Sequence, residues 1–230
     1  MTCDSLYLYE EVMLLALRDR QGTIASGTMY QYAIGGAILA ELLLGNRVEI
    51  EQVRKRKFLK LIDPTPLGDP LIDECLEKIR NAKRRAVLQT WVSRFASLRQ
   101  LKHRAARQLC RRGILRMEED DILLIFKRKV YPEINPAPER EIIRRLETAI
   151  STEKTDIDPK TVVLLSLTKS AELLKIVFDK KRLKSRKARI EQVANGEVTG
   201  KAAHEAIQAM QAAVMVAVIM PMMMTTTMSH

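Results

Sequence analysis

The sequence predicts an all-α protein: a single helical domain around a central helix bundle, with one β-hairpin. Apolar residues recur at helical spacing through most of the 230 residues. Hydrophobic residues make up 47% of the chain, which is enough to form a core. One segment near the middle has the pattern of two strands around a turn. We expect the domain to span residues 1–219, and residues 220–230, a low-complexity tail, to be disordered.

The first half of the chain is expected to be helical, with an extended or irregular segment at residues 47–58. That segment holds a basic run, Arg54–Lys57, whose charges we expect to face solvent. The second helix contains Gly35-Gly36, at a cost of roughly 1 kcal/mol per glycine. Another helix or a ligand must approach closely there, and we favour helix packing. The expected helices are Leu6–Leu17, a long apolar helix from Ser26 or Thr28 to Leu44, Leu71–Arg80, Lys83–Phe95 and Leu98–Arg112.

A hairpin is expected directly after Gly113. Its strands would be Ile114–Met117 and Ile122–Phe126, joined by an acidic turn at Glu118–Asp121. Because the run Ile122–Phe126 is apolar throughout, a core on one side cannot satisfy both of its faces. The chain's own helices could cover both faces, or the hairpin could mediate homo-oligomer contacts. Further helices are expected at Glu139–Thr152, Asp158–Phe178, Arg182–Ala194 and Thr199–Ile219, the last of them in the centre of the bundle.

The helix before this hairpin is strongly basic. Its buried stripe is expected to consist of Leu98, Leu101, Ala105 and Leu109, which recur at helical spacing. Lys and Arg total 39 in the chain against 28 Asp and Glu, giving a net charge of +11. This excess indicates an anionic partner, most plausibly a phosphate. The basic side chains divide between one face with Arg99, Lys102 and His103 and another with Arg104, Arg107 and Arg111.

Several classes of function are disfavoured by what the sequence lacks. It has no glycine-rich phosphate loop, no HExxH or GxSxG motif and no metal-ligand spacing, so we expect no enzyme, cofactor or metal. The paired carboxylates Glu10-Glu11 and Asp73-Glu74 are interpreted as charges on helix faces. Three cysteines without CxxC spacing favour a reduced, intracellular protein. The longest apolar stretches fall short of a membrane span, so any membrane contact should be peripheral.

Five ordered segments resemble the Golgi phosphoprotein 3 family. The segment 6–22, an apolar helix with Glu10-Glu11 and a glycine end, resembles the opening of that family, and 36–42 resembles its second helix. Residues 66–74 are similar to the family's GD-x-LLDE element. The other matching segments are Trp91-Val92 with Arg99–Leu115, and Leu164–Leu167 with Leu173-Leu174. The resemblance implies a mostly helical domain that binds phosphatidylinositol 4-phosphate at a membrane surface.

The resemblance also implies which residues contact the lipid. Two family arginines, three residues apart on the helix before the hairpin, match Arg99 and Lys102. The family's tryptophan and a further arginine would fall near Ser26 and at Gly35, so both groups are absent from those positions here. Candidate supporting residues are Arg104 and the aromatic Tyr30. The implied location is the cytosolic face of a membrane, the Golgi in a eukaryote.

Two other functional interpretations of the basic helix remain open. A basic helix followed by glycine and a hairpin is also the pattern of a winged-helix nucleic-acid binder. An acidic turn at Glu118–Asp121 would be repelled by nucleic-acid phosphates, so we expect no nucleic-acid partner. A helical scaffold that binds acidic protein tails is the other alternative.

Overall fold

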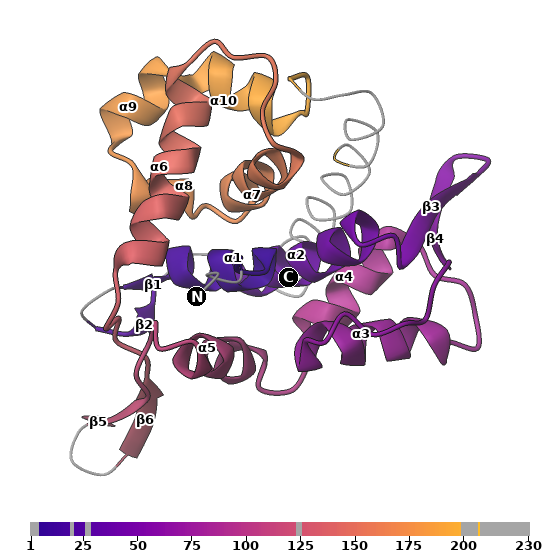
Figure 1. Ribbon diagram of the computed structural model, residues 1–230, viewed down its shortest axis with the longest axis horizontal. Helices are drawn as coiled ribbons and strands as arrows, with labels where there is room; N and C mark the ends of the chain where they lie inside the picture. The colour runs from indigo at the N-terminus through magenta and orange to yellow at the C-terminus, as the bar shows by residue number, and fades with distance from the viewer. Residues whose placement is uncertain (1–4, 19–20, 26–28, 123–125, 199–206, 208–230) are drawn as a thin grey trace, which may run out of the picture.

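Two helices form the centre of the fold. The computed structural model describes residues 5–18, 21–25, 29–122, 126–198 and 207 (Figure 1). Helix α1 (Leu8–Ala16) packs beside α2 (Tyr30–Leu44), and every residue of α1 is buried. The expected central bundle is confirmed in this respect, and the protein is mostly helical.

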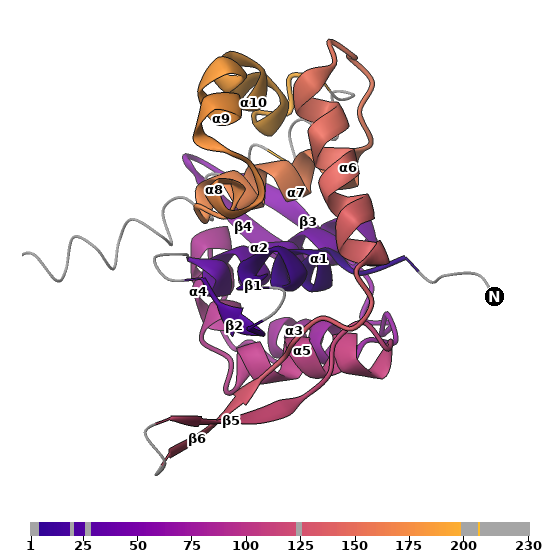
Figure 2. The same ribbon diagram turned by 90° about the vertical axis from the view of Figure 1, so that its left-hand side faces the viewer.

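The other helices lie in two groups on opposite sides of the central pair (Figures 1 and 2). The first group is α3 (Pro70–Arg80), α4 (Leu88–Ala96) and α5 (Leu101–Arg111). The second group is α6 (Ala137–Ser151), α7 (Pro159–Ser170), α8 (Leu174–Val177), α9 (Lys180–Ser185) and α10 (Lys187–Ala194).

The expectation of a single hairpin is wrong, because the described residues form three two-stranded antiparallel sheets. One of them joins β3 (Val48–Val53) to β4 (Arg56–Leu61) within the segment expected to be extended or irregular. Apolar and polar residues alternate along the first part of β3, which is the strand pattern that the basic run obscured. Arg54 has a φ of +56° at the turn, and its side chain is exposed as expected. The shortest sheet pairs β1 (Leu17–Arg18) with β2 (Thr23–Ile24).

The register of the expected hairpin is also different. The acidic run forms strand β5 (Glu118–Ile122) instead of the turn, and it pairs with the basic strand β6 (Phe126–Val130). Opposite charges face each other across the ladder, as in the Arg128–Asp120 ion pair of 2.6 Å. Such cross-strand pairs stabilise a sheet, which favours this register over the expected one. Residues 114–117 therefore precede the hairpin, and Ile122 and Phe126 pair at its outer end.

Close helix packing explains one of the two interior glycines of α2. A Cβ atom added to Gly35 would lie 2.7 Å from the Val92 carbonyl oxygen and 3.0 Å from the Ala96 nitrogen of α4. Both are backbone atoms that no rotamer change could move away. The expectation that a helix approaches the glycine pair closely is thus confirmed at Gly35.

Several predicted helices are shorter than expected. The predicted helix 158–178 is interrupted between α7 and α8, where Glu172 has a φ of +63°. The predicted helix 83–95 begins only at Leu88, because Val87 forms a β-bridge with Phe58. The predicted helix 182–194 divides at Arg186 into α9 and α10. The expected helix 199–219 and tail 220–230 lie outside the described residues, except for Ile207, which is buried.

Candidate anion-binding site

Helix α5 presents its basic residues outward because its apolar stripe is anchored in the core. Leu101, Ala105 and Leu109 are buried as predicted, and the helix packs against α1. The first turn contains no acidic residue, so the positive end of the helix dipole is not neutralised locally. This turn is therefore favourable for an anion.

The two residues matched to the lipid-binding pair lie at the start of α5. Arg99 is exposed and just precedes the helix, because Gln100 adopts a left-handed conformation with a φ of +55°. Lys102 is partly buried in the first turn, and its pKa is lowered by burial and by the nearby Arg128 of β6. Neither residue has an acidic partner among the residues that the structure describes. Both cations are thus available to an external anion.

The neighbouring His103 is held in the same positive environment. Its pKa is lowered by burial and by Lys102, Lys129 and Arg107. The Nδ1 atom lies 2.8 Å from the Tyr131 hydroxyl oxygen, which fixes the ring at the base of the hairpin. The side chains that lower the pKa of His103 are thus all basic, although Arg128 of β6 is itself paired with Asp120.

The two supporting residues are placed differently. Arg104 forms an ion pair with Glu74 of α3, so part of its charge is compensated. Tyr30 is the first residue of α2; it is partly buried against the core, and burial raises its pKa. Arg99 and Arg104 line the same cavity, whereas Lys102 and Tyr30 are not among its lining residues. The structure thus brings together two of the four residues.

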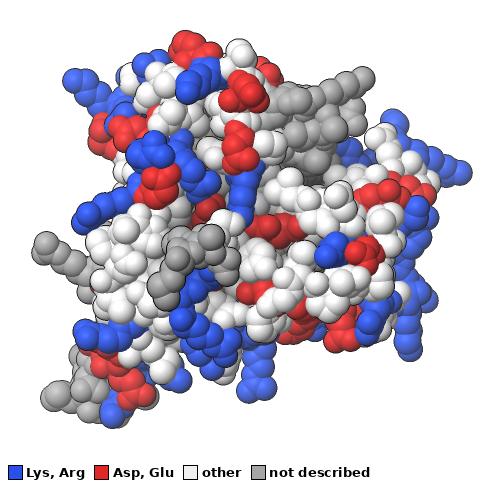
Figure 3. All heavy atoms as spheres, in the orientation of Figure 1, with Lys and Arg blue, Asp and Glu red and all other residues white. Residues whose placement is uncertain are grey.

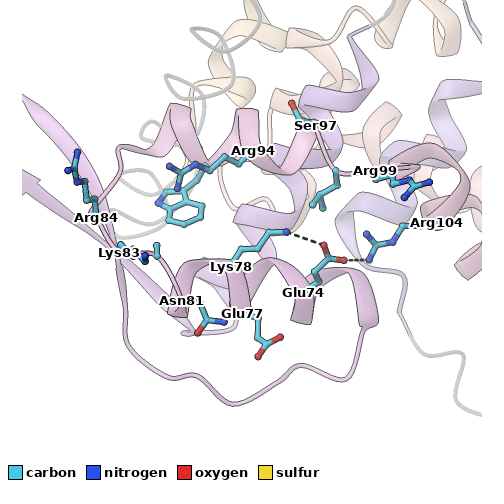
Figure 4. Close-up of a pocket in the computed structure, with 13 residues that line it drawn as sticks. Glu74, Glu77, Lys78, Asn81, Lys83, Arg84, Arg94, Ser97, Arg99 and Arg104 are labelled. Atoms are coloured by element: carbon cyan, nitrogen blue, oxygen red, sulfur yellow. Dashed lines mark hydrogen bonds and ion pairs between the residues drawn. The ribbon is translucent and has the colours of Figure 1, made fainter.

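This cavity lies between α3, α4 and the start of α5 and has a volume of about 980 Å³ (Figure 4). Its acidic lining residues are Glu74 and Glu77, and the indole of Trp91 also lines it. Sequence reasoning missed most of its basic residues because they come from separate segments without a common spacing. Its basic lining residues are Lys78, Lys83, Arg84, Arg94, Arg99 and Arg104.

Positive charge is visible across this side of the molecule. In Figure 3, lysine and arginine side chains protrude beneath α5 and along the edge near β3 and β4. Acidic side chains lie among them, so the charge is distributed in patches. The excess of basic residues seen in the composition therefore reaches the surface.

Glu10 and Glu11, interpreted from the sequence as charges on a helix face, do not face solvent. Both are buried because α1 is covered on all sides, and their pKa values are raised by burial. Glu10 is paired with Arg112 at 2.9 Å and Glu11 with Arg145 at 2.5 Å. These carboxylates join α1 to its neighbours.

The described part of the chain lacks two kinds of feature. No group of histidine, cysteine or carboxylate side chains there is arranged to hold a metal ion. No helix there is both long enough and apolar enough to cross a bilayer.

Comparison with known proteins supports the resemblance noted from the sequence motifs. The profile described as Golgi phosphoprotein 3 matches residues 8–210, which is most of the chain. The protein belongs to the Golgi phosphoprotein 3 family. The GD-x-LLDE-like element of the family now has a structural role, because its Asp69 caps α3 and accepts hydrogen bonds from Leu71 and Ile72.

Two curated relatives of the family carry the name vacuolar protein sorting-associated protein 74. The one from Eremothecium gossypii is 26% identical over 181 residues, which cover 69% of this chain and 54% of the relative. The one from Schizosaccharomyces pombe is 27% identical over 172 residues, which cover 66% and 50%. The chain thus spans about half the length of these relatives. Neither the family nor the relatives are named for an enzyme.

Proposed function

We propose that this protein is a peripheral membrane adaptor that binds phosphatidylinositol 4-phosphate or a related anionic lipid through Arg99 and Lys102. The names of the family and of its relatives refer to the Golgi and to protein sorting, which supports a role in membrane trafficking. The proposed location is the cytosolic membrane face.

The observation that carries the proposal is the pair of uncompensated cations at the start of α5. Lys102 is partly buried beside Arg128, so its ammonium group is destabilised in the free protein. A phosphate bound between Arg99 and Lys102 would relieve this repulsion, and the first-turn amides of α5 would favour the same anion. A lysine neutralises a phosphate as a point charge, although it lacks the bidentate geometry of arginine.

The first prediction concerns this pair. Replacing both Arg99 and Lys102 with alanine should weaken binding to vesicles containing phosphatidylinositol 4-phosphate by roughly thirtyfold, since each basic residue near an anionic surface contributes about 1 kcal/mol. Vesicle sedimentation measures the loss, and circular dichroism should show unchanged helix content. The matched control is Lys180→Ala with Lys181→Ala on α9, which removes the same charge from an exposed site outside the group α3–α5.

Comparison with this control shows whether the two residues form a binding site or act only through their charge. If both double variants lose the same affinity, then only net charge matters and the proposed site is wrong. Duplex DNA and acidic peptides are included as competitors, because displacement of the protein from vesicles by either at low concentration would favour one of the other readings of the basic helix. Phosphatidylserine vesicles test whether the phosphoinositide headgroup is required.

We also propose that the β5–β6 hairpin mediates contact between copies of the protein. The hairpin extends away from the helical body (Figure 2), and the apolar pair Ile122 and Phe126 lies at its outer end. Replacing both with threonine keeps the strand propensity but exchanges two apolar residues for polar ones. We expect a parent oligomer to dissociate, as measured by light scattering, while Lys129→Ser on β6 leaves it intact. A parent that is already monomeric at micromolar concentration would contradict this proposal.

A further inference from the structure

We propose that the cavity between α3 and α4 is a second ligand site, which takes a small molecule bearing at least two phosphate groups. It is built on Trp91, Arg94 and the segment Lys83-Arg84, none of which belongs to the lipid contact proposed above. Arg99 lies at the point where the two sites meet. The inference does not depend on the proposed lipid function.

The first observation is a buried hydrogen-bond donor without a partner. Trp91 is only 2% exposed, and its indole Nε1 has no acceptor among the residues that the structure describes. Buried donors are almost always hydrogen-bonded, and leaving one unsatisfied is unfavourable. Because the same side chain lines the cavity, a ligand oxygen is positioned to supply the missing acceptor.

The second observation is uncompensated charge around the cavity. Glu74 is paired with both Lys78 and Arg104, as the dashed lines in Figure 4 show. Four other basic lining residues have no acidic partner within the described residues. They are Lys83, Arg84, Arg94 and Arg99.

This charge sets the class of ligand. One phosphate monoester carries about 1.5 to 2 negative charges near pH 7, so two phosphates would balance four cations. Arginine side chains bind phosphate oxygens in a bidentate manner, which favours phosphate over a less charged anion. A single carboxylate would leave most of the positive charge uncompensated.

The size of the cavity and its walls favour a small molecule. Its volume of about 980 Å³ is at the upper end of the range for small-molecule sites, and three helices and the two segments that connect them contribute to its walls. The guanidinium of Arg94 lies over the Trp91 ring, with its Cζ 4.7 Å from the ring centroid. Because Arg94 is exposed, its side chain is free to turn toward a bound anion and open access to the indole.

Trp91 also makes the site directly observable, because it is the single tryptophan of the chain. Titrating the protein with soluble inositol 1,4,5-trisphosphate should shift the tryptophan emission and give a saturable binding curve. Inorganic phosphate should bind at least tenfold more weakly, because it offers one phosphate group instead of several. In a second titration the protein is mixed with vesicles containing phosphatidylinositol 4,5-bisphosphate. A shift of tryptophan emission with these vesicles but not with the soluble trisphosphate would show that the ligand is a lipid headgroup.

Variants separate this site from the lipid contact. Arg84→Ala and Arg94→Ala should each weaken trisphosphate binding about tenfold, whereas Lys102→Ala should leave it unchanged because Lys102 does not line the cavity. Trp91→Phe removes only the indole donor and should cost up to tenfold in affinity, measured by calorimetry because the fluorescent probe is lost. Arg84 is exposed, so its variant tests the site even if Trp91→Phe does not fold.

Three results would overturn the proposal. The first is the absence of any emission change or heat with both the soluble trisphosphate and the vesicles. The second is full binding by the Arg84→Ala and Arg94→Ala proteins. The third is a loss confined to the lipid contact. Loss of binding in Lys102→Ala alone would show that the trisphosphate occupies the proposed lipid contact and that the cavity is not its site.

Discussion

Replacing Asp69 with alanine should lower the free energy of unfolding by about 3 kcal/mol. The side chain is 5% exposed and accepts four hydrogen bonds. Its Oδ1 accepts from the backbone amides of Leu71 at 2.9 Å and Ile72 at 3.0 Å, which caps α3. Its Oδ2 accepts from the hydroxyl of Tyr9 at 2.7 Å and from Gln108 at 3.2 Å. Asp69 therefore joins α1, α3 and α5.

The size of this effect follows from what the variant leaves behind. Loss of an N-cap costs about 1 kcal/mol, and an unsatisfied buried hydroxyl costs about 1–3 kcal/mol. Tyr9 is fully buried, so water cannot replace the lost acceptor. Urea denaturation provides the measurement. Asp69→Asn keeps an acceptor at the cap and should lose much less, and equal losses in the two variants would contradict the account.

Replacing Arg112 with alanine should cost about 3 kcal/mol of stability at neutral pH. Glu10 has a side chain only 1% exposed, and Arg112 donates to it from the end of α5 at 2.9 Å. Removing one partner of such a pair leaves an uncompensated charge in the interior. Arg111→Ala is the matched control, because the adjacent Arg111 is exposed and hydrogen-bonds only to Gln108 across one helical turn. Its loss should be within about 0.5 kcal/mol.

This second variant should also change the pH dependence of stability. Burial already raises the pKa of Glu10 above its ordinary value, despite the opposing effect of Arg112. Because the pKa of Glu10 is raised in the folded state, the contribution of Glu10 to stability is fully present below its unfolded-state pKa. That contribution is lost as the pH rises through its folded-state pKa. Without Arg112 the folded pKa rises further, so the destabilisation should grow as the pH rises from the folded-state pKa of Glu10 in the parent protein towards neutral pH. A constant deficit over that interval would show that Arg112 acts only through packing.

The sequence predicted the helices well where burial has helical periodicity, as in α5 with Leu101, Ala105 and Leu109. It failed where pairing between strands decides the structure. The acidic run was interpreted as a turn because its partner, the basic strand, is recognised only when the two are aligned in register. The alternation in β3 was missed because Arg54–Lys57 dominates the local composition.

The same difference between local sequence patterns and tertiary contacts applies to the candidate sites. Arg99 and Lys102 could be found from one helix and its spacing. The cavity could not, because its basic residues lie on α3, α4 and α5 and in the segments that connect them, and only tertiary packing places them around Trp91. The interpretation of Glu10 and Glu11 as charges on a helix face failed for the same reason. The burial of α1 on every side depends on tertiary contacts with α5, α6 and α7.

The central position of α1 has a consequence for synthesis on the ribosome. This helix is made before α2, which packs beside it, and long before α5, α6 and α7, which also cover it and extend to Ser170. At 5–20 residues per second, full coverage of its apolar surface takes roughly 8–30 s. Through this interval the nascent chain carries an apolar helix that is only partly covered and that contains two glutamates, so we expect it to engage chaperones until the second half of the domain has emerged.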